Sequence, residues 1–118
     1  MFWLLLDLGA ATTPHGDVHR AILAITKKMA QRPNSAALHL RRGELHRIHR
    51  DWVNAERDYR RALNLDPSMQ VARRALARMF LQAGRPTDAK KEVRGFLIAA
   101  PADADGWALL ARALETLG

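Results

Sequence analysis

The sequence has no cysteine among its 118 residues, so it can form neither disulfides nor thiolate zinc sites. Aromatic residues make up only 6% of the chain, and it therefore lacks the stacking platforms that bind single-stranded nucleic acid. It contains no HExxH, P-loop or GxSxG motif. Its only serines, Ser35 and Ser68, are expected at helix starts. We therefore expect no enzyme, no cofactor and no specific nucleic-acid partner.

The charge balance is basic, because 19 Lys and Arg against 12 Asp and Glu give a net charge of +7. This excess favours acidic partners, whether peptides, nucleic acid or anionic lipid. The same excess of positive charge is also explained without an acidic partner, by solubility and an arginine-rich source proteome. The remaining composition, 48% apolar and 26% charged, is typical of a soluble globular protein, and the length fits one domain.

A period of 34 residues runs through the chain and relates Pro33, Pro67 and Pro101. The same interval relates four further sets: Ala21, Ala55 and Ala89; Ile25, Tyr59 and Val93; Gly9, Gly43 and Ala77; Gly16, Arg50 and Gly84. Small residues recur where two helices must approach closely, and proline recurs where a unit ends, because it cannot continue a helix. A fixed period of this length marks an array of helical repeats.

This pattern resembles the tetratricopeptide repeat, with a good match from Pro33 to Gly118 and a weaker one before it. The resemblance implies an all-α fold, an α-solenoid of antiparallel helix pairs in a right-handed superhelix with two to three repeats. The expected units are residues 15–33, 34–67 and 68–101, followed by a capping helix at 102–118. We expect that last helix to cover the final apolar face and to show polar residues outside.

Capping signals and apolar stripes place the helices. The expected ranges are about 17–31, 35–49, 52–64, 69–83 and 86–100, with Asp17, Ser35, Asp51 and Ser68 as capping residues. The last helix is expected to begin at Ala102 or Asp103. Gly84 is expected to end one helix, and Pro86 to set the first turn of the next.

The segment 1–14 begins with the apolar run MFWLLLDLGAA. It is interpreted either as a signal-peptide remnant or as a degenerate first helix, with the remnant slightly favoured. An exported, periplasmic location is accordingly favoured slightly over a cytoplasmic one. The run is too short to span a membrane. The protein is expected to be a monomer or a weak homodimer that joins through the Trp3–Leu4 end.

The resemblance implies a ligand groove on the concave side, lined by the first helix of each pair. The matching positions are Leu40, Glu44, Arg47, Arg74, Arg78, Leu81, Asp105 and Arg112. Because guanidinium groups bind carboxylates in two-point fashion, the expected guest is an acidic peptide or partner protein. The other interpretation is a solvated face with internal Glu44–arginine pairs and no dedicated ligand. One subtype of the family clamps a C-terminal carboxylate with lysine and asparagine, but here the asparagine is missing and Glu44 intrudes.

A group of histidines supports a second hypothesis. His39, Arg42 and His46 stand where the family places large apolar residues, and His15 and His19 lie one unit earlier. Such residues can hold Zn²⁺, Cu²⁺ or, with Arg42, a phosphate. They would make the chain an exported metal- or anion-binding accessory protein. The alternative is structural: partly buried rings that hydrogen-bond to the backbone or to Asp17.

Overall fold

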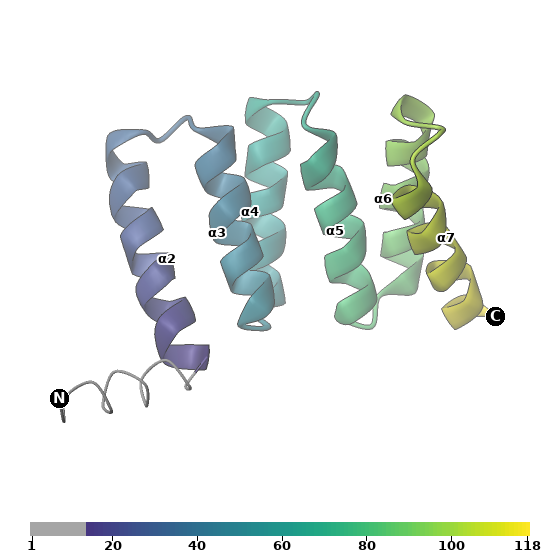
Figure 1. The fold of residues 1–118 in the computed structure, drawn as a ribbon, viewed down its shortest axis with the longest axis horizontal. Coiled ribbons are helices and arrows are strands. Elements are labelled where there is room, and N and C mark those ends of the chain that lie inside the picture. The colour runs from purple at the N-terminus through teal and green to yellow at the C-terminus, as the bar shows by residue number, and fades with distance from the viewer. Residues whose placement is uncertain (1–13) are drawn as a thin grey trace, which may run out of the picture.

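The computed structural model describes residues 14–118, which form six α-helices and no β-strand. The helices are α2 (Pro14–Gln31), α3 (Ala36–Ile48), α4 (Trp52–Leu65), α5 (Gln70–Gln82), α6 (Pro86–Ala99) and α7 (Ala104–Leu117). They stand side by side in chain order, and consecutive helices run in opposite directions (Figure 1). None of these helices is long and apolar enough to cross a membrane.

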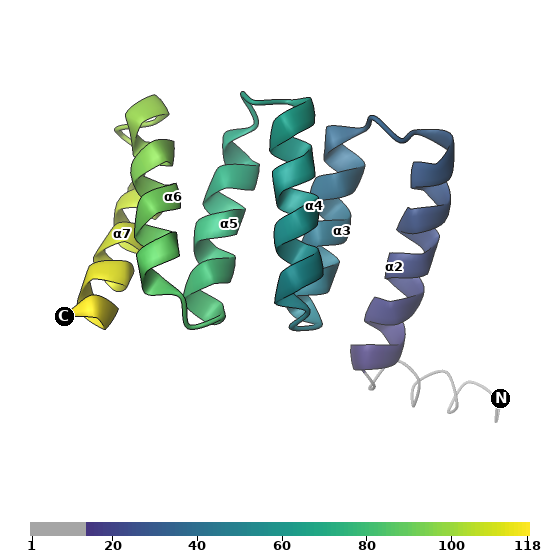
Figure 2. The ribbon, with the colours of Figure 1, turned by 180° about the vertical axis from the view of Figure 1, so that it is seen from behind.

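The helices form two layers. Figure 1 shows α3, α5 and α7 on the near side, and the opposite view in Figure 2 shows α4 and α6 in front of them. Helix α5 contacts both α3 and α7, whereas α2, α4 and α6 make no such contacts with one another in residues 14–118. An array of helices curves toward the layer in which neighbouring helices lie closer together. The α3–α5–α7 layer is therefore the inner, concave one. The predicted all-α solenoid of antiparallel helix pairs is confirmed.

The apolar core is concentrated in the C-terminal two-thirds of the array. One cluster comprises Ala55, Tyr59, Ala75, Leu76, Met79, Phe80, Ala89 and Ala113, and a second comprises Ala77, Val93, Phe96, Leu97, Leu109 and Leu110. Each large apolar side chain stabilises the fold by about 1.5–3 kcal/mol when it is fully buried. These clusters join α4, α5, α6 and α7, so each helix pair covers an apolar face of the next.

Most of the predicted helix boundaries are confirmed by hydrogen bonds. The Ser35 hydroxyl accepts from the Leu38 amide at 3.2 Å, and the Asp51 carboxylate accepts from the Asn54 amide at 3.2 Å. At the start of α7 the Asp103 carboxylate accepts from the Gly106 amide at 2.8 Å. Each of these side chains satisfies a backbone N–H that the first turn of a helix leaves without a partner. Pro33, Pro67 and Pro101 all lie just after a helix of the second layer.

The two turns that join α3 to α4 and α5 to α6 have the same conformation. Gly84 follows α5 with φ 77°, and Arg50, one period earlier, follows α3 with φ 61°. In both turns an amide bonds back to the carbonyl five residues before it: Asp51 to His46 and Arg85 to Phe80, each at 2.8 Å. Glycine adopts this left-handed backbone freely, but a residue with a side chain adopts it at a cost.

Two predicted caps are wrong. Helix α2 begins at Pro14, so Asp17 lies in its first turn, where its carboxylate accepts from Arg20 at 2.9 Å. Proline fits the start of a helix because its missing N–H would have no partner there. Helix α5 has Met69 at its N-cap, and the Ser68 hydroxyl donates to Asp66 Oδ1 at 2.6 Å instead. The Asp66 side chain thus forms the local turn after α4.

The expected polar outer face of the last helix is also wrong. Helix α7 covers the second cluster with Leu109 and Leu110, but it exposes Trp107, Leu114 and Leu117 by 44–52%. Trp107 and Leu114 stand one period after Arg73 and Phe80 of α5, and of these two α5 residues Phe80 is fully buried. Residues 1–13 of the segment predicted as a leader, which include Trp3 and Leu4, lie outside the described residues, and Pro14 begins α2.

Candidate functional site

The inner layer presents its polar side chains along α3, α5 and α7, which we call the inner face. The period relates its positions across the three helices: Leu40 to Arg74, Glu44 to Arg78 and Arg112, and Arg47 to Leu81. These seven residues and Asp105 were the predicted groove. The structure places all of them on α3, α5 and α7, but it gives them different surroundings.

The α3 part of the inner face is a closed hydrogen-bond network. Arg47 donates to Glu44 Oε2 through Nη2 at 2.8 Å and to Gln82 Oε1 through Nη1 at 2.9 Å. The Tyr59 hydroxyl donates to Glu44 Oε1 at 2.7 Å. Burial raises the pKa of Tyr59, and the hydrogen bond to Glu44 raises it further, so the phenol keeps its proton. The predicted internal pairing of Glu44 with arginine is therefore present, and Arg47 has little charge to offer a ligand.

Arg74 is similarly occupied. Its Nη1 lies 3.5 Å from Asp103 Oδ1 and 3.7 Å from Asp105 Oδ2, and its guanidinium stands 5.8 Å above the centre of the Phe96 ring. Asp103 also caps α7, so these contacts link α5 to the start of the next inner helix. Arg74 therefore acts chiefly as a bridge between helices.

Arg78 and Arg112 are different. They occupy the same period position on α5 and α7, which contact each other. No acidic side chain of residues 14–118 forms an ion pair with either of them. Leu40 and Leu81 are half-buried and pack against the apolar clusters, so they contribute little open apolar surface. The charge that the inner face can offer thus comes from Arg78 and Arg112.

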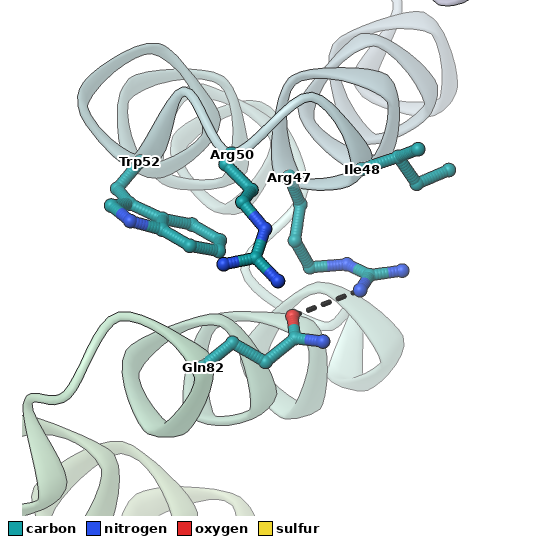
Figure 3. Close-up of a pocket in the computed structure, with 5 residues that line it drawn as sticks. All are labelled: Arg47, Ile48, Arg50, Trp52 and Gln82. Carbon is teal, nitrogen blue, oxygen red and sulfur yellow. Dashed lines mark hydrogen bonds between the residues drawn. The ribbon is translucent and has the colours of Figure 1, made fainter. Parts of the chain in front are cut away.

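A pocket of about 380 Å³ opens at the lower end of α3 and α5 as they stand in Figure 1. It is lined by Arg47, Ile48, Arg50, Trp52 and Gln82 (Figure 3). We call it the Arg50 pocket. In Figure 3 the side chains of Arg47 and Arg50 both extend toward Gln82, and the Trp52 ring lies beside Arg50. Sequence reasoning missed this pocket, although an arginine in register with Gly16 and Gly84 was a signal for it.

The histidines surround a carboxylate that sequence reasoning also missed. Asp58 is 1% exposed, and Arg42 donates to both of its oxygens at 2.8 Å. His39 Nδ1 and His46 Nε2 each lie 3.6 Å from an Asp58 oxygen. His39 Nε2 is 3.1 Å from the Pro33 carbonyl oxygen, so the expected hydrogen bond to backbone is present.

Asp58, rather than Asp17, is thus the acidic partner that the two rings share, and His46 Nδ1 also lies 3.8 Å from Asp51 Oδ2. Arg42 saturates the carboxylate and brings its own positive charge, which disfavours a cation at this position. Within residues 14–118 no group of three or more His, Asp or Glu side chains is arranged to hold a metal ion. His19 is exposed, and the side chain of His15 lies outside the described part of the chain. The contacts with Asp58 and with the Pro33 carbonyl favour a structural role for His39 and His46, and the metal site that includes His15 stays a prediction.

Solved structures of several helical-repeat proteins resemble this one. A thermophilic TPR protein of Thermus thermophilus has a TM-score of 0.78 and 29% identity; the match covers 86% of this chain. This chain spans about half of that protein, 53% of its length. The second TPR domain of human RPAP3, solved with the HSP70 peptide SGPTIEEVD, has a TM-score of 0.75 and 23% identity, with 91% of this chain and 89% of that one covered.

The first TPR of Spaghetti (RPAP3), bound to the HSP90 peptide SRMEEVD, has a TM-score of 0.79 and 22% identity, with 98% of this chain and 91% of that one covered. No curated protein sequence gives a match. The family model described as tetratricopeptide repeat matches residues 48–113, which is more than half of the chain. With two stacked helix pairs in the register of 34 residues, the chain belongs to the tetratricopeptide repeat family.

Proposed function

We propose that this chain is a non-enzymatic protein-interaction module that binds an extended acidic segment of a partner protein on its inner face. Proteins of this fold serve as such modules: two of the similar structures hold peptides, and each of those peptides carries two adjacent glutamates. A fold alone carries no specificity, so the proposal for this chain rests on its own side chains.

The observation that carries the proposal is the pair Arg78 and Arg112. The two residues occupy the same period position on α5 and α7, and neither has an acidic partner in the described chain. An unpaired guanidinium presents five N–H donors in a planar fork that matches a carboxylate. Two such forks in a row favour a ligand with two carboxylates.

The spacing fits an extended peptide that crosses the helices. Packed helices lie roughly 8–10 Å apart, and alternate side chains of an extended strand lie about 7 Å apart on one side. The long arginine side chains can close that difference. Arg78 and Arg112 thus match two acidic residues separated by one residue, and the half-buried Leu81 beside them provides limited apolar contact.

The test uses a fluorescent peptide with a Glu-Gly-Glu centre, flanked by glycine and serine and blocked at both ends, titrated against the protein by anisotropy. Reversing two interface charges, Arg78→Glu with Arg112→Glu, should weaken binding by about tenfold or more, since each reversal removes one attraction and adds one repulsion. Binding to the wild type should also weaken as salt rises, because these charges are partly exposed.

The matched control is Arg61→Glu with Arg94→Glu. Both residues are exposed on α4 and α6, in the other layer, and this pair changes the net charge by the same amount. The control should retain most of the affinity. Equal losses in both double variants would mean that the peptide responds to overall charge alone, and the inner-face proposal would then be rejected.

A further inference from the structure

The Arg50 pocket is an unassigned cavity at the end of the inner face (Figure 3). We propose that it binds an acidic side chain together with an adjacent apolar side chain, as an additional anchor for the peptide on the inner face. This inference rests on the proposed function and adds a specificity element to it. The charge, the wall and the backbone of the pocket each support it.

The charge of the pocket matches one carboxylate. No acidic residue lines it, and Arg50 forms no ion pair with any acidic side chain of residues 14–118. Glu44 balances the charge of Arg47, so Arg50 leaves one positive charge without compensation. The Gln82 oxygen accepts from Arg47, and in Figure 3 this oxygen faces the two guanidinium groups while the amide nitrogen points away from Arg50. The donors that face the pocket are therefore those of the Arg50 and Arg47 guanidinium groups, and Arg50 is the one that can bind a carboxylate in two-point fashion.

The wall of the pocket is partly apolar. The Trp52 ring lies beside the Arg50 guanidinium, and Ile48, on the other side of Arg47, is 54% exposed. Exposed apolar surface next to converging donors is typical of a ligand site. A volume of about 380 Å³ is at the lower end of such sites, which suits a pair of side chains. The occupant that fits is therefore an acidic residue next to an apolar residue.

The backbone of Arg50 is strained. Its φ of 61° is the left-handed value that Gly84 adopts in the equivalent turn, and Arg50 is the only residue other than glycine with positive φ within residues 14–118. Glycine would form this turn without the steric cost that Cβ imposes. Strained residues cluster at ligand sites, where the side chain has a use that offsets the strain. The Arg50 guanidinium points into the pocket, and its binding to a ligand would be the function that offsets the strain.

The pocket also continues the inner face. Gln82 lies one helical turn after Arg78 on α5, which is about 6 Å along the helix axis. Arg47 belongs to the predicted groove and to the pocket. A peptide whose carboxylates meet Arg78 and Arg112 therefore ends within one or two residues of the pocket, on the α3 side.

The variant Arg50→Gly distinguishes a role of Arg50 in ligand binding from a role in stability. It removes the guanidinium and relieves the backbone, so the melting temperature should rise by about 2–4 °C, since the relieved steric cost exceeds the entropic cost of glycine. Four peptides with blocked ends are compared. The first is the Glu-Gly-Glu peptide, and the second and third carry an additional Glu-Leu at the N-terminal or at the C-terminal side. The fourth is the tighter-binding extended peptide with Gln-Leu in place of Glu-Leu.

In the wild type, one Glu-Leu extension should increase affinity by about fivefold to tenfold, and the Gln-Leu version should lose that gain. Arg50→Gly should abolish the gain and leave binding of the short peptide unchanged. The control Arg61→Gln removes the same charge from the other layer and should keep the gain.

The inference is overturned if the short peptide binds but no extension helps, if Arg50→Gly keeps the gain, or if Arg50→Gly lowers the melting temperature. If the short peptide itself does not bind the wild type, the proposed function fails, and the two failures are thereby distinguished.

Discussion

Replacing Asp58 with leucine should destabilise the protein more than almost any other single change. Asp58 is 1% exposed and takes two 2.8 Å hydrogen bonds from Arg42, whose remaining contact is a 3.2 Å hydrogen bond to the Thr26 hydroxyl. Asp58→Leu leaves that guanidinium half-buried without its counter-charge. Breaking a buried pair in this way costs about 3–5 kcal/mol, a large share of the roughly 5–15 kcal/mol that keeps a domain folded. For a chain of this size the melting temperature should fall by roughly 12–20 °C.

The double variant Arg42→Leu with Asp58→Leu makes the prediction specific. An apolar pair of similar volume is often as stable as a buried ion pair, so the double variant should recover most or all of the wild-type free energy of unfolding. Urea denaturation followed by circular dichroism, on the wild type, both single variants and the double, gives the coupling energy between the two positions. We expect at least about 2 kcal/mol, as for residues in direct contact. A loss below about 1 kcal/mol in Asp58→Leu alone would refute the idea that this carboxylate neutralises a buried arginine.

Two further predictions concern the same helix pair. A Cβ on Gly43 would come within 2.8 Å of the Tyr59 ring, whereas the equivalent Ala77 faces the smaller Val93. Gly43→Ala should therefore cost about 1–2 kcal/mol in urea denaturation. In a Tyr59→Val background the ring contact is gone and a 3.3 Å approach to the Asp58 Cβ remains, so the cost should fall by about 1 kcal/mol or more; an equal cost in both backgrounds would contradict this. Burial lowers the pKa of His46 below its ordinary value of 6.5, so the unfolded chain takes up a proton at higher pH than the folded one. The melting temperature should be constant above about pH 7 and fall as pH drops through about 6.5, and His46→Gln should flatten that fall; an identical profile in the variant would contradict it.

Much of the fold was predictable because it depends on local and periodic signals. The prolines, the small residues and the caps Ser35 and Asp51 each act through their own backbone or the next turn, so their spacing alone places the helices. Asp17 and Ser68 misled for the same reason. Each has the chemistry of a cap, but Pro14 starts its helix earlier and Asp66 forms the turn instead.

The candidate site was less predictable, because its charges are set by partners on other helices. The sequence placed Arg47 and Arg78 in the same predicted groove, and only the structure shows that Arg47 donates hydrogen bonds to Glu44 and Gln82. Asp58 stands among charged neighbours in the stretch Glu56 to Arg60, and nothing in that stretch marks it as buried. Such residues are recognisable only once three helices are in place.

The polar centre around Asp58 also bears on how the chain avoids assembling in the wrong order. Successive hairpins of a repeat protein are alike, so one hairpin can dock in a place that belongs to another, within one molecule or between two. The contact between α3 and α4 carries Arg42 and Asp58, whereas the contact between α5 and α6 is lined by apolar side chains such as Leu76 and Val93. Exchanging α4 for α6 would bury Asp58 against Leu76 without a counter-charge, whereas Arg42 would meet Glu92, which stands one period after Asp58. Because burying a carboxylate without its counter-charge is costly, the Arg42–Asp58 pair disfavours the docking of α4 on α5 in place of α6.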